Sequence, residues 1–281
     1  MMKSIKRWIL LLVVLMILIG AGWWIVWGNT ALTVSEYTIT EEELPEAFSG
    51  FRIAQISDLH NAVFGENNEE LIAMLADTHP DMIVITGDLV DATRPDLEVG
   101  LAFARAAQEI APTYYVTGNH EAGLAARRDL LSGLEACGVM VLKNKRIEIT
   151  RDNESLLLIG LQDANFMTGE PEEAAREVLT KLMGKDDDYT VLLSHRPELY
   201  DVYVSFGMDL VFSGHAHGGQ FRLPFVGGLY APGQGWLPRY DGGLFTDDDT
   251  TMVVSRGLGN SRFPFRVNNR PEIVVVELKK G

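Results

Sequence analysis

The chain has 281 residues, enough for one large domain or two small ones, and 47% of them are hydrophobic, so it can bury a substantial core. Its formal net charge of −15 argues against a general affinity for nucleic acid, which needs a basic surface. The same charge argues against simple electrostatic adhesion to an anionic membrane. The single cysteine, Cys137, cannot form an internal disulfide, so nothing in the fold depends on an oxidising compartment.

The N-terminal segment differs in kind from the rest of the chain. Residues 8–27 contain no charged residue and would span about 30 Å as a helix, enough to cross the hydrocarbon core of a bilayer. Basic residues precede this segment and tryptophans crowd its far end, as at a membrane interface: Lys3, Lys6, Arg7, Trp23, Trp24 and Trp27. A cleaved signal peptide would have a shorter apolar region that ends in a small-x-small site. We therefore expect a cytoplasmic N-terminus at 1–7, a transmembrane anchor at 8–27, and residues 28–281 outside the cytoplasm.

Residues 28–50 are predicted to link this anchor to a domain that covers residues 51–281. Within the linker, residues 31–40 alternate well enough for an edge strand, which three glutamates and Pro45 would end.

From residue 51, strands and helices are predicted to alternate. Expected strands lie at 51–56, 82–85 and 114–116, and expected helices at 67–78, 95–110 and 124–136. Such alternation indicates an α/β fold with a largely parallel sheet. Several short strands between 139 and 160 indicate a second sheet or an antiparallel edge. The alternation resumes with a helix at 170–183 and strands at 191–193 and 210–212, and strands near 252–255 and 273–278 close the chain.

Five short polar clusters each follow directly on an apolar run. They contain Asp58 and His60, Asp88 and Asp91, Asn119 and His120, His195, and His215 and His217. Ligand-bearing loops of open α/β sheets lie at the carboxyl ends of strands, so we expect these clusters to meet. Aspartate, asparagine and histidine without cysteine bind hard or borderline cations through oxygen and nitrogen, which leaves manganese, iron or zinc open.

Phosphodiesters need this kind of site. Their anion repels nucleophiles and their alkoxide leaves poorly, and two cations about 4 Å apart address both problems by clamping the attacking and leaving oxygens. Holding two cations so close requires a bridging carboxylate, imidazoles and an amide. The clusters supply that inventory: Asp58, His60, Asp88, Asn119, His195, His215 and His217. We therefore predict two divalent metal ions as cofactors and a phosphoester as substrate.

His120 is left over from this inventory. Because it follows Asn119, it could hydrogen-bond the phosphoryl oxygen or protonate the departing alkoxide. Asp91, three residues after Asp88, could hold the His120 ring as carboxylates near metal sites hold imidazoles.

In this combination of clusters the chain resembles the calcineurin-like metallophosphoesterase superfamily. Its pattern of D-x-H, GD-x-x-D, GNH[ED], a lone His and GH-x-H is complete over roughly residues 51–278. The resemblance implies two mixed β-sheets packed as a sandwich flanked by helices. It implies that one metal is held by Asp58, His60, Asp88 and His217. It implies that the other is held by Asp88, Asn119, His195 and His215, with Asp88 bridging, and that His120 and Asp91 are catalytic.

Within that superfamily the chain looks like the bacterial membrane-anchored phosphodiesterase branch. The resemblance rests on the N-terminal anchor, an H-x-H-G-G-Q loop at 215–220 and an S-R-G-L-G segment at 255–259. It implies a lipid or cell-envelope phosphoester as substrate. A nucleotide-sugar-lipid pyrophosphate hydrolase is an alternative, although a cytosolic substrate fits poorly with the expected orientation.

Acidic residues avoid two stretches, 210–240 and 250–271, which carry arginines and aromatics instead. We interpret these stretches as a wall for an anionic substrate with an apolar part, with Arg222, Arg239 and Arg256 as candidate substrate contacts. In the alternative interpretation the aromatics close the fold and the arginines form surface ion pairs.

Two further functions stay open. A protein phosphatase could use the same scaffold. A non-enzymatic, envelope-binding protein could use its metals only to hold loops together, and would not need His120.

Overall fold

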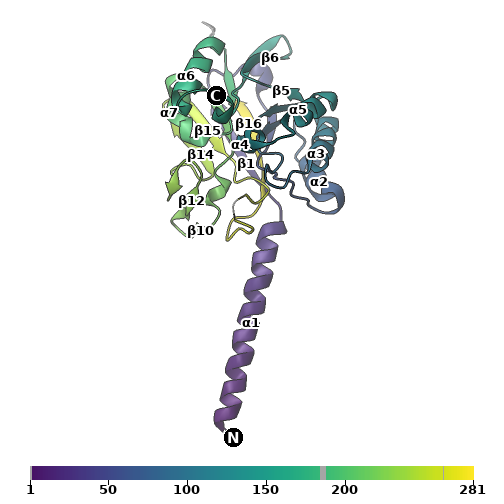
Figure 1. Ribbon diagram of the computed structural model, residues 1–281. Helices are drawn as coiled ribbons and strands as arrows, with labels where there is room; N and C mark the ends of the chain where they lie inside the picture. The colour runs from purple at the N-terminus through teal and green to yellow at the C-terminus, as the bar shows by residue number, and fades with distance from the viewer. Residues whose placement is uncertain (1, 184–187, 262) are drawn as a thin grey trace.

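The computed structural model describes residues 2–183, 188–261 and 263–281 (Figure 1). The chain begins with one long helix, α1 (Met2–Thr30), that projects from the domain as a single rod. Its residues 5–30 make it, among the described residues, the one helix long and apolar enough to cross a membrane. Most of its apolar side chains are exposed along this length.

The last turn of α1 is attached directly to the domain. The Asn29 amide donates to the Arg266 carbonyl at 3.1 Å, and the Arg266 N–H donates back to Asn29 Oδ1 at 2.7 Å. The Arg270 guanidinium lies over the Trp27 ring at 4.9 Å and donates through Nε to the Ala31 carbonyl. The expected linker is therefore short, because the first strand already begins at Thr33.

In the described parts of the chain, two six-stranded sheets form the body. The first has the order β1 (Thr33–Glu41), β16 (Glu272–Lys280), β2 (Arg52–Ile56), β3 (Met82–Thr86), β4 (Thr113–Val116) and β5 (Met140–Val141). The second has the order β14 (Gly243–Asp247), β15 (Thr250–Val254), β9 (Leu210–Ser213), β8 (Thr190–Leu193), β7 (Glu154–Gly160) and β6 (Lys145–Arg151). Both are mixed, because β16 runs antiparallel to β2, and β14 and β6 run antiparallel to their neighbours.

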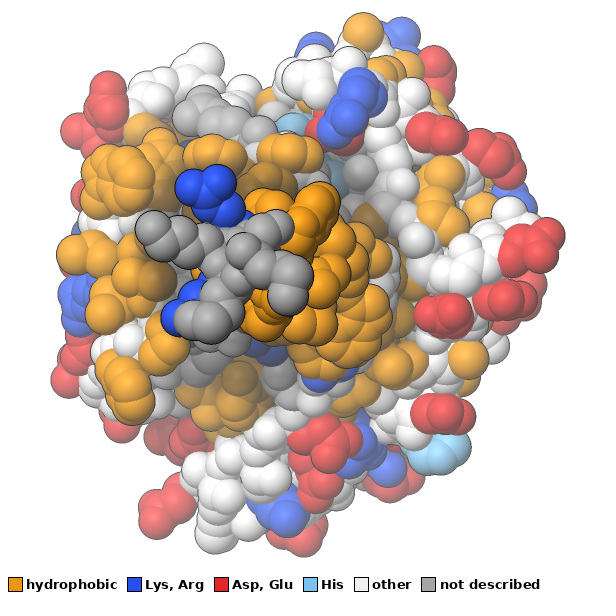
Figure 2. Space-filling model, turned by 90° about the horizontal axis from the view of Figure 1, so that it is seen from below, with side chains coloured by type: hydrophobic (Ala, Val, Ile, Leu, Met, Phe, Trp, Pro, Cys, Tyr) orange, Lys and Arg blue, Asp and Glu red, His pale blue; other side chains and the backbone are white. Residues whose placement is uncertain are grey.

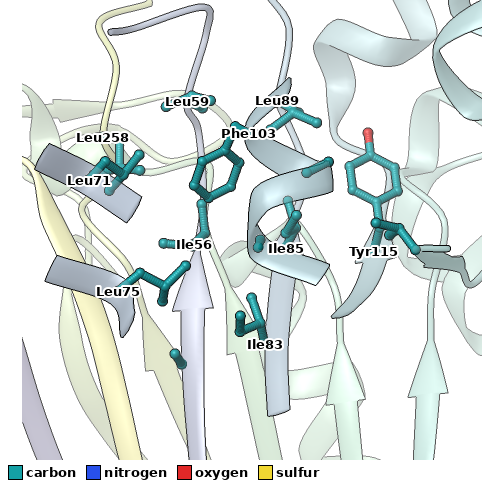
Figure 3. Close-up of a cluster of buried hydrophobic side chains, with 14 of the residues drawn as sticks. Ile56, Leu59, Leu71, Leu75, Ile83, Ile85, Leu89, Phe103, Tyr115 and Leu258 are labelled. Atoms are coloured by element: carbon teal, nitrogen blue, oxygen red, sulfur yellow. The ribbon is translucent and has the colours of Figure 1, made fainter. Parts of the chain in front are cut away.

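Helices cover the outer faces of the sheets. Over the first sheet lie α2 (Glu69–Asp77), α3 (Leu97–Ile110) and α5 (Arg127–Ala136), and over the second lie α6 (Pro171–Leu182) and α7 (Tyr200–Ser205). The Asp96 carboxylate caps α3 by accepting the Val99 N–H. Figure 3 shows Ile56 and Ile85 packed toward Leu71 of α2 and Phe103 of α3.

The strands are apolar on both faces because they are covered on both. Along β3, Ile83 and Ile85 face the helices, whereas Val84 faces the second sheet and packs in one cluster with Leu193 and Phe212. The expected sandwich of two mixed sheets flanked by helices is confirmed.

Smaller elements complete the chain. A short helix, α4 (Asn119–Gly123), precedes α5, and two hairpins pair β10 (Arg222–Leu223) with β11 (Gly227–Gly228) and β12 (Tyr230–Ala231) with β13 (Gly235–Trp236). Single 3₁₀ turns lie at Glu46–Phe48, Glu66–Asn68, Ala164–Phe166, Pro197–Leu199 and His217–Gly219. Of the two alternatives for the short strands between 139 and 160, the second sheet is the correct one, because β6 and β7 belong to it.

Candidate metal centre

The five polar clusters converge, because each follows a strand whose carboxyl end lies at the same edge of the sandwich. Asp58 follows β2, Asp88 follows β3, Asn119 follows β4, His195 follows β8 and His215 follows β9. Several of these residues have left-handed backbone conformations that non-glycine residues seldom adopt: Asp58, His60, Asp88, His215 and His217. Backbone strain of this kind concentrates at functional sites, where the surrounding structure holds it in place.

One group of ligand atoms comes from Asp58, His60 and His217, all buried. His217 Nε2 lies 3.2 Å from Asp58 Oδ1 and 3.2 Å from His60 Nε2. Three atoms that face one another from two loops, the one after β2 and the one after β9, leave a common point between them. This group can hold one cation.

A second group comes from Asp88, His195 and His215, also buried. His195 Nε2 lies 3.3 Å from Asp88 Oδ2, 3.1 Å from His215 Nδ1 and 3.2 Å from Asn119 Oδ1. Asp88 Oδ2 also lies 3.5 Å from His60 Nε2 in the first group. The Asp88 carboxylate therefore faces both groups.

Each carboxylate uses one oxygen for the protein and turns the other toward the histidines. Asp58 Oδ2 accepts from the Ser57 hydroxyl at 2.6 Å and from the His215 N–H at 3.0 Å. Asp88 Oδ1 accepts from the His120 N–H at 2.8 Å. This division fixes the orientation of Asp58 Oδ1 and Asp88 Oδ2.

The charges at the centre are strongly coupled. Burial would raise the pKa of Asp58, but His217 and His60 hold that pKa well below its ordinary value. Burial would likewise raise the pKa of Asp88, which His195 and His60 keep low instead. Burial lowers the pKa of the His217 imidazole to about 3, so this ring is neutral and able to offer a lone pair to a cation.

The arrangement fits two metal ions and is hard to explain without them. Imidazole nitrogens of different rings face each other at 3.1–3.2 Å in both groups. Within the described residues, Asp58 Oδ1 and His60 Nδ1 are buried without a hydrogen-bond partner, a condition that native proteins avoid. A cation in each group would satisfy the facing nitrogens and the Asp58 oxygen together. The donor set of oxygen and nitrogen suits manganese, iron or zinc.

Glu121 holds the centre together, a role that the sequence analysis did not predict. Its buried carboxylate accepts the backbone N–H groups of Gly118 at 2.7 Å, Asp88 at 2.9 Å and Leu89 at 2.9 Å. Burial, with the nearby Asp88 charge, raises its pKa to about 7. Glu121 thus ties the loop after β3 to the loop after β4. The position of Glu121 directly after Gly118-Asn119-His120 is the sequence feature that could have indicated this role.

His120 stands at the opening of the centre, half-buried, with its ring against the ring of His60 at 4.4 Å between centroids. The backbone N–H of Ala92, rather than Asp91, donates to His120 Nδ1 at 3.0 Å. Nδ1 is therefore an acceptor, and the proton of the neutral ring lies on Nε2. Asp91 Oδ1 accepts from the Thr93 N–H, the Thr93 hydroxyl and the Arg94 N–H, and so shapes the turn that presents Ala92.

A cavity of about 270 Å³ opens over the metal centre. Three site residues line it, together with apolar and small residues of the later loops: Asn119, His120, Ala216, His217, Gln220, Tyr230, Pro232, Gly233, Ser261 and Phe263. The cavity therefore combines a metal-facing floor with a wall that is partly aromatic.

The three candidate substrate arginines lie elsewhere in the structure. Arg222 pairs with Asp241 at 3.0 Å, Arg256 pairs with Glu272 at 2.5 Å, and Arg239 lies over the Tyr240 ring. None of them is among the described residues that line the cavity. These contacts match the alternative of structural ion pairs. Arg266, which the sequence did not single out, is instead fully buried, with its guanidinium 3.5 Å from His217 Nδ1.

Comparison with known proteins agrees with this geometry. The family model of the calcineurin-like phosphoesterases matches residues 51–219. The uncharacterized metallophosphoesterase YkuE of Bacillus subtilis is 31% identical over 254 residues, covering 88% of this chain and 86% of that protein. The phosphodiesterase YaeI of Escherichia coli is 30% identical over 238 residues, covering 81% and 82%. A zebrafish transmembrane protein with a metallophosphoesterase domain is 28% identical, covering 88% of this chain and 57% of that protein.

The family model spans more than half of the chain, and the residues at its metal-binding clusters are all present and brought together. The chain therefore belongs to the calcineurin-like phosphoesterase family and is a metal-dependent phosphoester hydrolase that uses two divalent metal ions.

Proposed function

We propose that this enzyme is a phosphodiesterase anchored in the cell membrane by α1, with its catalytic domain outside the cytoplasm and a lipid or cell-envelope phosphoester as its substrate. The observation that carries the proposal is the place of the cavity. Viewed along α1, histidine side chains are visible in a hollow beside the helix (Figure 2). Tyr230 of β12 lines the cavity over the metal centre, and β12 lies at the end of the domain from which the apolar helix emerges (Figure 1).

The lining of the cavity supports a substrate with an apolar part. Tyr230, Pro232 and Phe263 contribute apolar surface to its wall. A diester rather than a monoester is favoured by the similarity to a relative named a phosphodiesterase.

In this proposal one metal ion would be held by Asp58, His60, Asp88 and His217, and the other by Asp88, Asn119, His195 and His215. Two such ions, when bound, supply a clamp on the attacking and leaving oxygens of an in-line displacement. The chain contributes the rigidity of that clamp. The Glu121 carboxylate and Asp58 Oδ2 accept backbone N–H groups and so fix the loops that carry the ligands.

His120 would act on the substrate itself. With Nδ1 accepting from Ala92, its Nε2–H is the hydrogen-bond donor that faces the cavity. That donor can hold a phosphoryl oxygen or pass a proton to the departing alkoxide. Asp91 would support His120 through the turn that it organises, one step removed from the ring.

The distribution of basic residues supports the orientation. Lys6 and Arg7 precede the apolar part of α1, and positively charged flanks favour the cytoplasmic side. The domain would then lie outside the cytoplasm.

Hydrolysis of bis-p-nitrophenyl phosphate by the purified full-length protein tests the reaction. Activity that a chelator removes and that manganese, iron or zinc restores is the expected result. Phosphorus NMR of membrane lipid extracts incubated with the enzyme tests the substrate class. A phosphoprotein or a nucleotide-sugar lipid hydrolysed in preference to every membrane phospholipid would contradict the lipid diester assignment.

A further inference from the structure

Bulky apolar side chains are exposed on loops that surround the mouth of the cavity. They come from the β10–β11 hairpin, the β12–β13 hairpin and the loop before β16. We call them the apolar rim: Leu223, Phe225, Val226, Trp236, Leu237, Phe263 and Phe265. Phe225 is fully exposed, and Trp236 and Leu237 are 77% and 63% exposed. Exposed apolar surface of this extent marks an interaction site in a folded protein.

The apolar rim lies on the face of the domain from which α1 leaves. In Figure 1, β10 and β12 are at the end of the domain nearest α1. Figure 2 shows hydrophobic side chains gathered on this face around and beside the helix, with most acidic side chains at the periphery. The two stretches that carry the rim, 210–240 and 250–271, contain no acidic residue, so no acidic side chain of their own opposes contact with an anionic surface.

Two rim residues have backbone conformations that are strained for residues other than glycine. Phe225 has φ 66° and Leu237 has φ 53°, a region where glycine or asparagine would be less strained. A loop selected only for solubility would carry a small or polar residue at such positions. Here each position carries a large apolar side chain that points away from the protein core.

The rim is continuous with the wall of the cavity. Phe263 lines the cavity, and its ring packs on Phe221 at 5.3 Å, which also contacts Phe265 at 5.5 Å. Tyr230 also lines the cavity and packs on Trp236 at 5.6 Å. Ring contacts therefore join Phe265 and Trp236 of the exposed rim to aromatic residues that line the cavity.

We propose that the apolar rim enters the same leaflet of the bilayer from which α1 emerges, so that the cavity opens onto the membrane surface and receives a lipid phosphoester directly from it. The occupant is a bilayer rather than a protein because the rim lies on the same face as α1, the helix that is long and apolar enough to cross a membrane (Figure 2). Trp23, Trp24 and Trp27 near the helix end are residues typical of the membrane interface. The inference rests on the membrane anchoring and lipid substrate proposed above. It assigns to the rim the transfer of that substrate from the bilayer to the cavity.

The contact is tested on the full-length protein in vesicles of phosphatidylglycerol and phosphatidylcholine. Phe225→Cys, in a Cys137→Ala background, carries an environment-sensitive fluorophore. Glu148→Cys, an exposed position of β6 at the far end of the domain, is the matched control. Lipids with a nitroxide on the acyl chain should quench the label at 225 and leave the label at 148 unaffected. A label at 225 that acyl-chain nitroxides leave bright and aqueous iodide quenches would overturn the inference.

Activity gives an independent measurement. Phe225→Asp and Leu237→Asp place charges on the rim without touching the described cavity lining. We expect turnover of a phospholipid diester in vesicles to fall at least about tenfold, because a charge opposes interfacial insertion. Turnover of bis-p-nitrophenyl phosphate should stay unchanged. Equal losses on both substrates, or none on either, would contradict delivery through the rim.

The quenching measurement and the activity measurement together distinguish a failure of this inference from a failure of the proposed function. Quenching at 225 with every phospholipid left intact supports bilayer contact and rejects the lipid substrate. Hydrolysis of vesicle lipids without quenching at 225 rejects bilayer contact and keeps the lipid substrate.

Discussion

At the level of single residues, Asp88 has a different task for each carboxylate oxygen. Oδ1 accepts the His120 N–H, and Oδ2 faces His195 in one group of ligands and His60 in the other. A neutral amide in its place could keep the first contact, but it would leave the histidines without the negative charge that two cations require.

We predict that Asp88→Asn lowers bound metal in the purified protein and lowers turnover by more than about 100-fold, since even residues outside the ligand shell reach that size of effect. Elemental analysis and the diester assay measure the two quantities. Asp152→Asn, an exposed residue of the β6–β7 turn, is the control and should change neither. Full metal content with full turnover in the Asp88 variant would exclude a bridging role.

A substitution at His120 tests the chemical step without removing a metal ligand, because His120 lies beside the proposed ligands and is not one of them. We predict that His120→Asn keeps both metals and loses about 10²–10⁴-fold in turnover of alkyl diesters, whose alkoxide must be protonated as it leaves. With p-nitrophenolate as the leaving group the loss should be smaller. Parallel measurements on the two substrate classes make the comparison.

A weaker loss of the same pattern is expected for Asp91→Asn, since Asp91 acts on His120 through the turn that positions Ala92. If His120→Asn slows both substrate classes equally, His120 only holds a phosphoryl oxygen. If it releases metal, its assignment outside the ligand shell is wrong.

The metal-binding residues could be found from the sequence because each follows an apolar strand directly, and parallel strands end at one edge. The role of Glu121 could not be found in that way. It depends on N–H groups that two separate loops bring together in space. Arg222 and Arg256 show the reverse problem, because their partners Asp241 and Glu272 lie outside the acid-free stretches that made the arginines look unpaired.

At the level of elements, glycines let the loops after β4 and β9 approach the metal centre. A Cβ on Gly214 would lie 1.9 Å from Ser57 Oγ and 2.5 Å from Asp58 Oδ2. A Cβ on Gly118 would lie 2.2 Å from Asp88 Oδ1. Both distances are far below van der Waals contact, so these strand ends can approach only without a side chain.

We predict that Gly214→Ala displaces Asp58 and weakens metal binding by at least about tenfold, the size seen when residues that orient metal ligands are removed. Titration of the metal-free protein with manganese measures the affinity. Gly123→Ala in α4 is the control, because its Cβ would meet only Ala92 Cβ at 3.6 Å, an ordinary contact. An unchanged affinity in the Gly214 variant would show that the loop after β9 can move aside.

Most long elements were predictable within a few residues because their apolar periodicity is strong. The helix expected at 124–136 is shorter and is preceded by the separate α4, since the polar cluster itself forms a helical turn. The six residues of α7 are too few to show a period, and β14 at an edge lacks a clear alternation. The pairing of β1 with β16, at opposite ends of the chain, could not be read from local pattern at all.

At the level of the whole molecule, the orientation of the domain is testable in cells. We predict that protease added to intact spheroplasts digests residues 28–281, because the basic N-terminal flank should stay in the cytoplasm. Immunoblotting of the domain before and after lysis measures its accessibility. Protection until lysis would place the domain inside and would favour a cytosolic substrate such as a nucleotide-linked lipid.

The attachment of α1 has a consequence for which molecules can react. Asn29 is hydrogen-bonded to Arg266 in both directions, and Arg270 lies on Trp27, so these contacts hold the last turn of the helix against the domain. With α1 set in a bilayer, the metal centre would stand at one constant height above the acyl chains. For the lipid substrate proposed above, we expect selection by the distance between the scissile phosphorus and the membrane plane, whatever the remaining headgroup contains.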